Sequence, residues 1–180
     1  MSGSKVVSIA GIFAGAFWMI ASAAAQSSAA PDAEHVAKIY MTAFFAGDIK
    51  DAADLTDPRT LDRIREAFIS DLLTVTDPDQ EKAILTNLGV AKTTADLGKV
   101  DVKALYIALT EADRRRTPQV FETMKRTRVE ILGSTPNPTG GVTVRLRIIT
   151  PTAGGTPSSQ ESGLLMRQVL GGWKVVGNAP

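Results

Sequence analysis

The sequence contains no cysteine and a single histidine, His35, in 180 residues. Without cysteine the chain forms no disulfide and no thiolate metal site, and it lacks the residue that lipoprotein processing modifies. One histidine without cysteine or converging carboxylates does not make a zinc site. We therefore expect no metal and no cofactor, and a fold that is stabilised by packing alone.

The sequence also lacks a strong net charge, because 20 Lys and Arg face 19 Asp and Glu, which gives +1 at neutral pH. Such a chain has no global field that attracts nucleic acid or an acidic membrane, so we expect no nucleic-acid partner. One local basic group could bind a carboxylate or phosphate. The alternative is a solvated helix end, with arginines near a C-terminal dipole. The candidate anion-binding residues are Arg114, Arg115, Arg116 and Arg128.

Residues 1–25 have the layout of a secretory signal: Lys5, an apolar run over residues 6–20, and small residues at 23–25. This pattern predicts cleavage before Gln26 and a periplasmic or secreted protein. The alternative is an uncleaved membrane anchor, because the apolar run approaches the roughly 20 residues that span a bilayer. We expect membrane attachment only in that case. The remaining chain is then a flexible lead-in at 26–34 and a single domain at 35–180.

Apolar residues recur at helical spacing through the first two thirds of the chain, and local signals mark where the helices begin and end. Asp57 and Asp77 each precede a proline, which is a strong helix start, and Gln80 completes a capping box with Asp77. Gly47 and Gly89 end two of the periodic segments. We expect helices over residues 32–46, 48–55, 58–72, 78–88 and 101–116, with short pieces at 94–97 and 118–124.

The last third of the chain predicts an antiparallel sheet. Apolar and polar residues alternate over residues 142–148, as in a strand with one buried face. Two further strands are expected at 127–133 and 161–170, and Gly171 and Gly172 turn the chain into the final segment, 173–176. Helices first and strands last indicate a segregated α+β domain, with the N-terminal helices covering a sheet of three or more strands.

Two stretches carry a resemblance to a known superfamily. Residues 36–48, which end in Ala46, Gly47 and Asp48, and residues 165–176 resemble the opening helix and the closing hairpin of nuclear transport factor two and ketosteroid isomerase. SnoaL-like polyketide cyclases belong to the same superfamily. The resemblance implies a cone-shaped fold, in which a curved sheet wraps a helix and holds a ligand at its mouth. The helical middle of this chain departs from that pattern.

The resemblance makes Tyr40 a candidate for the tyrosine that stabilises an oxyanion in such isomerases. The position of their general-base aspartate falls near Ile64, however, and His35 is the remaining weak candidate for a base. The alternatives are that Tyr40 is a core aromatic and that His35 is solvated. The residues expected to bind a ligand in a mostly apolar pocket are Tyr40, Phe44, Phe68, Leu146 and Trp173.

These observations favour an exported, non-enzymatic module that binds a small apolar molecule or an envelope protein. Two alternatives stay open: a small isomerase, cyclase or dehydratase that uses Tyr40, and an anchored subunit of an envelope complex. The sequence names no ligand and no oligomeric state.

Overall fold

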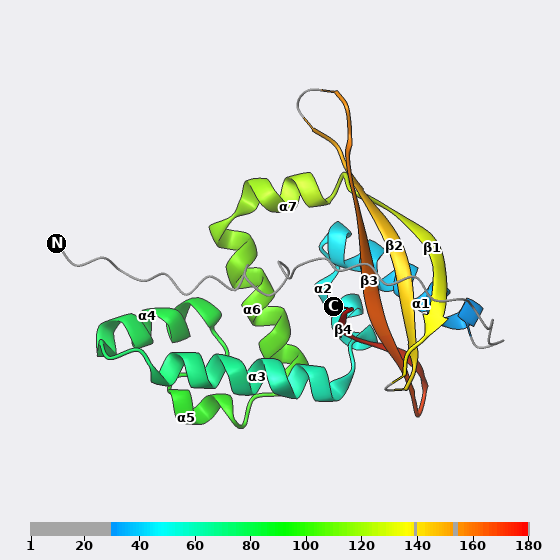
Figure 1. Ribbon diagram of the computed structural model, residues 1–180. Helices are drawn as coiled ribbons and strands as arrows, with labels where there is room; N and C mark the ends of the chain where they lie inside the picture. Colours follow the sequence, from blue (N-terminus) through cyan, green and yellow to red (C-terminus); the bar gives the residue numbers. More distant parts are fainter. Residues whose placement is uncertain (1–29, 139, 153–154, 180) are drawn as a thin grey trace.

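The computed structural model describes residues 30–138, 140–152 and 155–179, and in these ranges helices come first and strands last (Figure 1). This arrangement confirms the predicted α+β class. The expected signal segment, residues 1–25, lies outside the described residues. The first helix, α1, begins at Ala30, so the end of the lead-in expected at 26–34 is helical.

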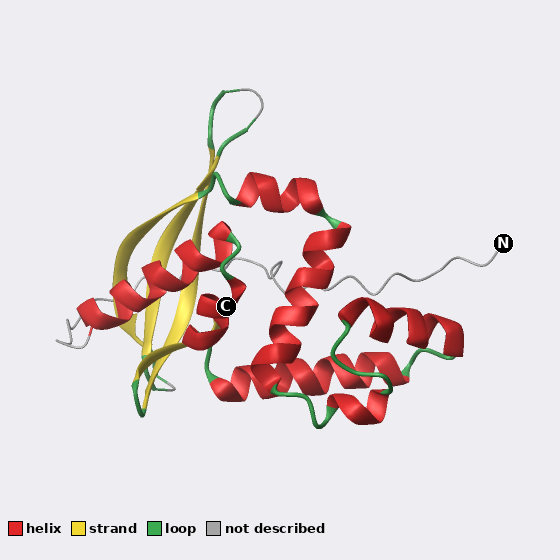
Figure 2. Cartoon of the chain, turned by 180° about the vertical axis from the view of Figure 1, so that it is seen from behind, coloured by secondary structure: helices red, strands yellow, loops and turns green. Residues whose placement is uncertain are grey.

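The sheet is a four-stranded antiparallel meander in the order β1-β2-β3-β4. Register shifts lie between Ile131 and Gly133 in β1 and between Leu165 and Met166 in β3. Bulges of this kind bend a strand and increase its twist, which agrees with the curved, open sheet in Figure 2. The strands are β1 (Arg128–Pro136), β2 (Val142–Thr150), β3 (Ser158–Val169) and β4 (Gly172–Asn178).

The alternation in β2 turns Val142, Val144 and Leu146 to one face, where all three are buried. The helices α1 (Ala30–Ala46) and α2 (Ile49–Leu55) pack with that face. Gly47 ends α1 with a φ of +90°, a conformation that glycine adopts without strain. The first core, as we call it, consists of these two helices and the inner face of the sheet (Figure 2).

The remaining large helices do not cover the sheet but build a second core of their own. Their apolar faces meet at Leu72, Leu88 and Leu105, among other buried residues. Local signals start them as the sequence predicts: Asp77 Oδ1 accepts from Asp79 N at 2.9 Å, and Asp101 Oδ1 from Ala104 N at 2.9 Å. The helices are α3 (Pro58–Leu73), α4 (Pro78–Leu88), α5 (Thr94–Leu97) and α6 (Val102–Arg116), and α7 (Pro118–Met124) then leads to β1.

The two cores meet where the chain passes from α2 into α3 beside β4. Asp57 N donates to Val175 O at 2.8 Å, and Thr60 Oγ1 donates to Val176 O at 2.8 Å. Thr56 forms a parallel bridge with Val175. The segment from Asp54 to Thr60, which we call the joint, therefore adds a short stretch of backbone pairing to the outer edge of β4.

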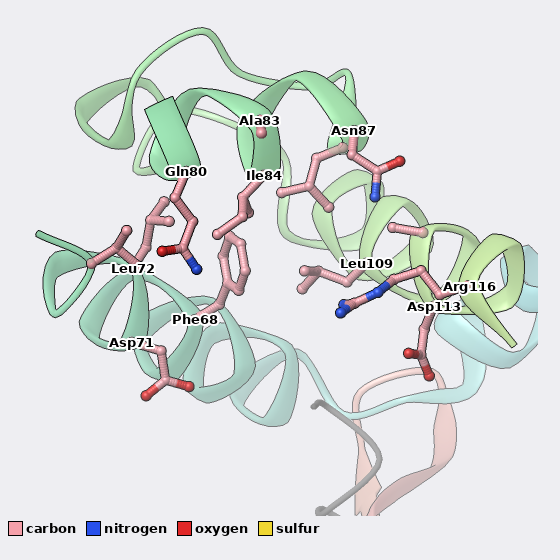
Figure 3. A pocket seen from close by; sticks show the side chains of 13 residues that line it. Phe68, Asp71, Leu72, Gln80, Ala83, Ile84, Asn87, Leu109, Asp113 and Arg116 are labelled. Atoms are coloured by element: carbon pink, nitrogen blue, oxygen red, sulfur yellow. The ribbon is translucent and has the colours of Figure 1, made fainter. Parts of the chain in front are cut away.

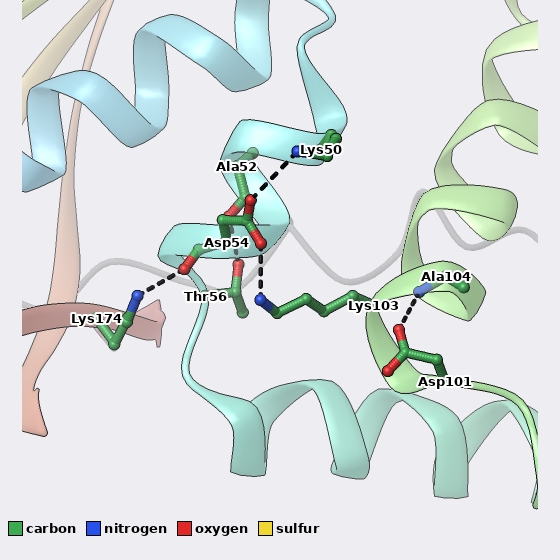
Figure 4. Close-up of polar contacts among 8 residues, drawn as sticks. All are labelled: Lys50, Ala52, Asp54, Thr56, Asp101, Lys103, Ala104 and Lys174. Atoms are coloured by element: carbon green, nitrogen blue, oxygen red, sulfur yellow. Dashed lines mark hydrogen bonds and ion pairs between the residues drawn. The ribbon is translucent and has the colours of Figure 1, made fainter. Parts of the chain in front are cut away.

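Charged side chains cross the joint from both sides (Figure 4). Lys103 Nζ of α6 lies 2.7 Å from Asp54 Oδ1, and Lys174 Nζ of β4 donates to Asp54 O at 2.6 Å. The hydrogen bond from Lys103 is the main cause that lowers the pKa of Asp54. Because Asp54 is partly exposed, these contacts add little to the free energy of unfolding. Their main effect is to orient the first core relative to the second.

A buried carboxylate provides the main polar contact of the joint. The Asp57 side chain is 1% exposed and accepts from Arg59 N at 2.9 Å, which caps α3. Its second oxygen, Oδ2, accepts from Arg167 Nε of β3 at 3.0 Å and from Arg167 Nη2. One carboxylate thus holds the start of α3 against the sheet.

Candidate functional site

A cleft of about 310 Å³ lies between α3, α4 and α6, on the second core (Figure 3). Its volume is at the lower end of the range for small-molecule sites, which are mostly apolar with a few placed polar groups. This cleft has that composition. Its lining residues are Phe68, Asp71, Leu72, Val75, Gln80, Ala83, Ile84, Asn87, Leu88, Leu109, Ala112, Asp113 and Arg116.

Three helices supply the apolar part of the cleft. Phe68 and Leu72 come from α3, Ile84 from α4 and Leu109 from α6. Leu72 and Leu109 are buried, whereas Ala83 is exposed at the rim. Phe68 and Ile84 are partly exposed, so the cleft lies at the edge of the second core, above buried side chains of α3 and α6.

Polar side chains surround this apolar surface unevenly. Figure 3 shows the Arg116 guanidinium pointing past Leu109 into the cleft, while the carboxylates of Asp71 and Asp113 lie at its outer edge. Gln80 reaches from α4 toward α3. Gln80, which the sequence predicts as part of a capping box, therefore lines the cleft. Asp77 caps α4 through its own carboxylate.

The five residues expected to bind a ligand do not lie together but belong to two different cores. Tyr40, Phe44, Leu146 and Trp173 belong to the first core, either buried in it or packed against it. Phe68 belongs to the second core and lines the cleft. Helical spacing or strand alternation indicates that a residue faces inward, but periodicity does not tell which inward faces meet.

Tyr40 is 8% exposed, and the side chains of Tyr106 and Thr56 are the neighbours that influence the pKa of its hydroxyl. Its ring stacks with that of Phe44 at a centroid distance of 6.2 Å. Burial is the main cause that raises the pKa of Tyr40, and the neighbouring Tyr106 adds to the shift. Burial likewise raises the pKa of Tyr106. This pair of phenols joins α1 to α6 between the two cores.

Alkaline pH is expected to destabilise the fold through this pair. An unfolded tyrosine ionises near pH 10, whereas the raised pKa keeps folded Tyr40 protonated. Above that pH the unfolded state binds fewer protons than the folded state, so stability falls as pH rises, by up to about 1.4 kcal/mol per pH unit for Tyr40. Below about pH 9 the tyrosines contribute no pH dependence.

Urea unfolding between about pH 9 and pH 11, followed together with tyrosinate absorbance, measures this effect. The chain has two tyrosines, so the double variant Tyr40→Phe, Tyr106→Phe is a complete control and is expected to show a shallower decline. Ionisation of the folded protein near pH 10 would contradict the assignment.

His35 lies exposed on α1. In the part of the chain that the structure describes, no group of three or more His, Cys, Asp or Glu side chains is placed to hold a metal ion. Within the same residues no helix combines the length and the apolar character needed to cross a bilayer.

The basic residues at the end of α6 point to different partners. Arg114 Nη1 lies 3.4 Å from Glu111 Oε1, and its guanidinium also packs on Gly47, whose added Cβ would lie 3.2 Å from Nη1. Arg115 Nη2 donates to Asn87 O at 2.7 Å. Arg116 lines the cleft, and Arg128 is exposed at the start of β1. The candidate anion-binding group is thus dispersed, and Arg116 is its member at the cleft.

Comparison of the chain with protein-family models, curated proteins and solved structures found no match. The geometry of the cleft is therefore the main indication of function.

Proposed function

We propose that this protein is an exported, non-enzymatic module that binds a small molecule in the cleft between α3, α4 and α6. The observation that carries the proposal is the cleft itself, a cavity of about 310 Å³ with an apolar surface and a polar rim. Burial of an apolar ligand there would stabilise the complex by about 25 cal/mol for each Å² of apolar surface removed from water. Such a site needs no catalytic group.

The environment of Tyr40 supports a binding module over an isomerase-type enzyme. An oxyanion-stabilising phenol must reach the reacting carbonyl of its substrate. The Tyr40 side chain is instead buried, with Tyr106 and Thr56 beside its hydroxyl, and His35 is exposed. The residues that resemble the ketosteroid isomerase superfamily belong to α1, β3 and β4, whereas the proposed site is made by the helices between them.

Export is proposed from the signal-like composition of residues 1–25. Mass spectrometry of the exported chain tests it, because a mature N-terminus at Gln26 is the expected result. Retention of residues 1–25 would instead support the anchored subunit of an envelope complex.

Decanol, a neutral amphiphile, serves as the probe for the cleft. We expect decanol to shift the methyl NMR signals of Ile84, Leu88 and Leu109 and to leave those of Val144 and Leu146 in the first core unchanged. Ala83→Trp is expected to block binding, because Ala83 lies at the rim and an indole there covers the apolar surface. The loss should be at least about tenfold in affinity, since one buried aliphatic contact is worth that much.

The matched control is Ala67→Trp, on an exposed position of α3 outside the cleft. It adds the same side chain and is expected to leave decanol binding unchanged. Shifts centred on the first core, or equal effects of the two variants, would refute the cleft as the ligand site.

A further inference from the structure

We propose that the cleft selects amphiphiles with a carboxylate headgroup, which Arg116 binds through its guanidinium. This inference rests on the proposed function, because it assigns the headgroup chemistry of the same cleft. Among the described residues Arg116 forms no ion pair, and its side chain points into the cleft (Figure 3). A planar guanidinium offers two parallel N–H donors to a carboxylate, which is a better match than a single charged amine provides.

Asn87 supplies a second donor at the same end of the cleft. Arg115 Nη2 donates to Asn87 O at 2.7 Å and lies 3.5 Å from Asn87 Oδ1. The amide oxygen is therefore turned toward Arg115, and the amide nitrogen is turned toward the cleft (Figure 3). Arg116 and Asn87 thus present N–H groups toward a ligand, and an anionic headgroup satisfies both.

The rim also carries two carboxylates, which reduce the expected preference for an anionic headgroup. Asp71 and Asp113 lie at the outer edge of the cleft, and neither forms an ion pair within the described residues. Asp71 is exposed and Asp113 is partly exposed, so water and salt screen both charges. Because Arg116 is exposed as well, we expect decanoate to bind about fivefold more tightly than decanol, in line with exposed ion pairs.

Calorimetric titration of the whole chain with decanoate, decanol and decyltrimethylammonium tests the headgroup while the apolar body stays constant. The expected order of affinity is decanoate, then decanol, then the cation, and added salt should reduce the spread. Arg116→Gln is expected to abolish the preference, so that the ratio of decanoate affinity to decanol affinity falls from about five to about one. Arg126→Gln makes the same change of charge on an exposed residue outside the cleft and should keep the preference.

The outcomes separate the two proposals. Binding of decanol without a preference for decanoate, or a preference that survives Arg116→Gln, overturns the headgroup assignment and leaves the proposed cleft in place. Tighter binding of the cation also overturns the assignment and points to Asp71 and Asp113 instead. If none of the three probes binds, the proposed function and this inference both fail.

Discussion

Replacement of Asp57 by alanine is expected to lower the free energy of unfolding by about 2–4 kcal/mol, through a lost helix cap and lost charge-assisted hydrogen bonds. The change removes the cap of α3 and leaves the Arg167 guanidinium without its carboxylate at the joint between the cores. Because the Arg167 side chain is 35% exposed, water solvates part of its guanidinium after the change, and the loss stays below that of a fully buried pair. Equilibrium unfolding in urea measures the loss.

Two further variants separate the cap from the ion pair. Asp57→Asn keeps a side-chain oxygen for Arg59 N, because asparagine is as good an N-cap as aspartate. We expect Asp57→Asn to cost less than Asp57→Ala by about 1 kcal/mol, the usual worth of a cap. Combined with Arg167→Met, either variant should show strong coupling in a double-mutant cycle. Additive losses, or a cost below about 1 kcal/mol for Asp57→Ala, would show that this contact does not hold the cores together.

Gly141→Ala is expected to destabilise the protein by about 3–5 kcal/mol, through strain and overpacking together. A Cβ at Gly141 would lie 2.1 Å from the backbone oxygen of Met166, on the neighbouring strand β3, at a φ of +87°. Backbone atoms of a paired strand cannot rotate away as a side chain can. The substitution therefore forces β2 and β3 apart where Val142 faces Met166 in the register.

The neighbouring glycine is the matched control. Gly140 has a φ of +98°, and nothing lies within 4 Å of a Cβ added there. Gly140→Ala therefore pays the conformational cost alone, about 1–2 kcal/mol. Thermal and urea unfolding of the two variants should differ by at least about 1 kcal/mol, and equal losses would mean that β2 and β3 are spaced more widely at this point.

Local signals predicted the helices well because each signal acts over a few residues. The caps at Asp57, Asp77 and Asp101 bond to backbone groups two or three positions away, so the sequence alone contains both partners. The ends of the strands were harder to predict. The segment expected at 127–133 continues to Pro136, since β1 is an edge strand and a proline at its end interrupts no inner pairing.

The sequence did not reveal that the helices divide between two cores. An amphipathic stripe shows that a helix has an inward face but not which other face it meets. Phe68 was therefore grouped with Tyr40 and Trp173, although it packs in the second core. The cleft left no sequence signal either, since it arises from how α3, α4 and α6 pack together. Of its polar residues, Gln80 was expected as part of a cap, and Arg116 as one of four candidate anion-binding residues.

The two cores also differ in how far apart their residues lie along the chain. The second core is built from one continuous segment, between Leu72 and Ala112 for its buried residues. The first core joins Ala33 and Tyr40, near the start, to Trp173 and Val175, near the end. The ribosome makes the chain from its N-terminus. The apolar face of α1 therefore remains uncovered during synthesis until the strands of the sheet have been made. The cleft-bearing helices have all their partners much earlier.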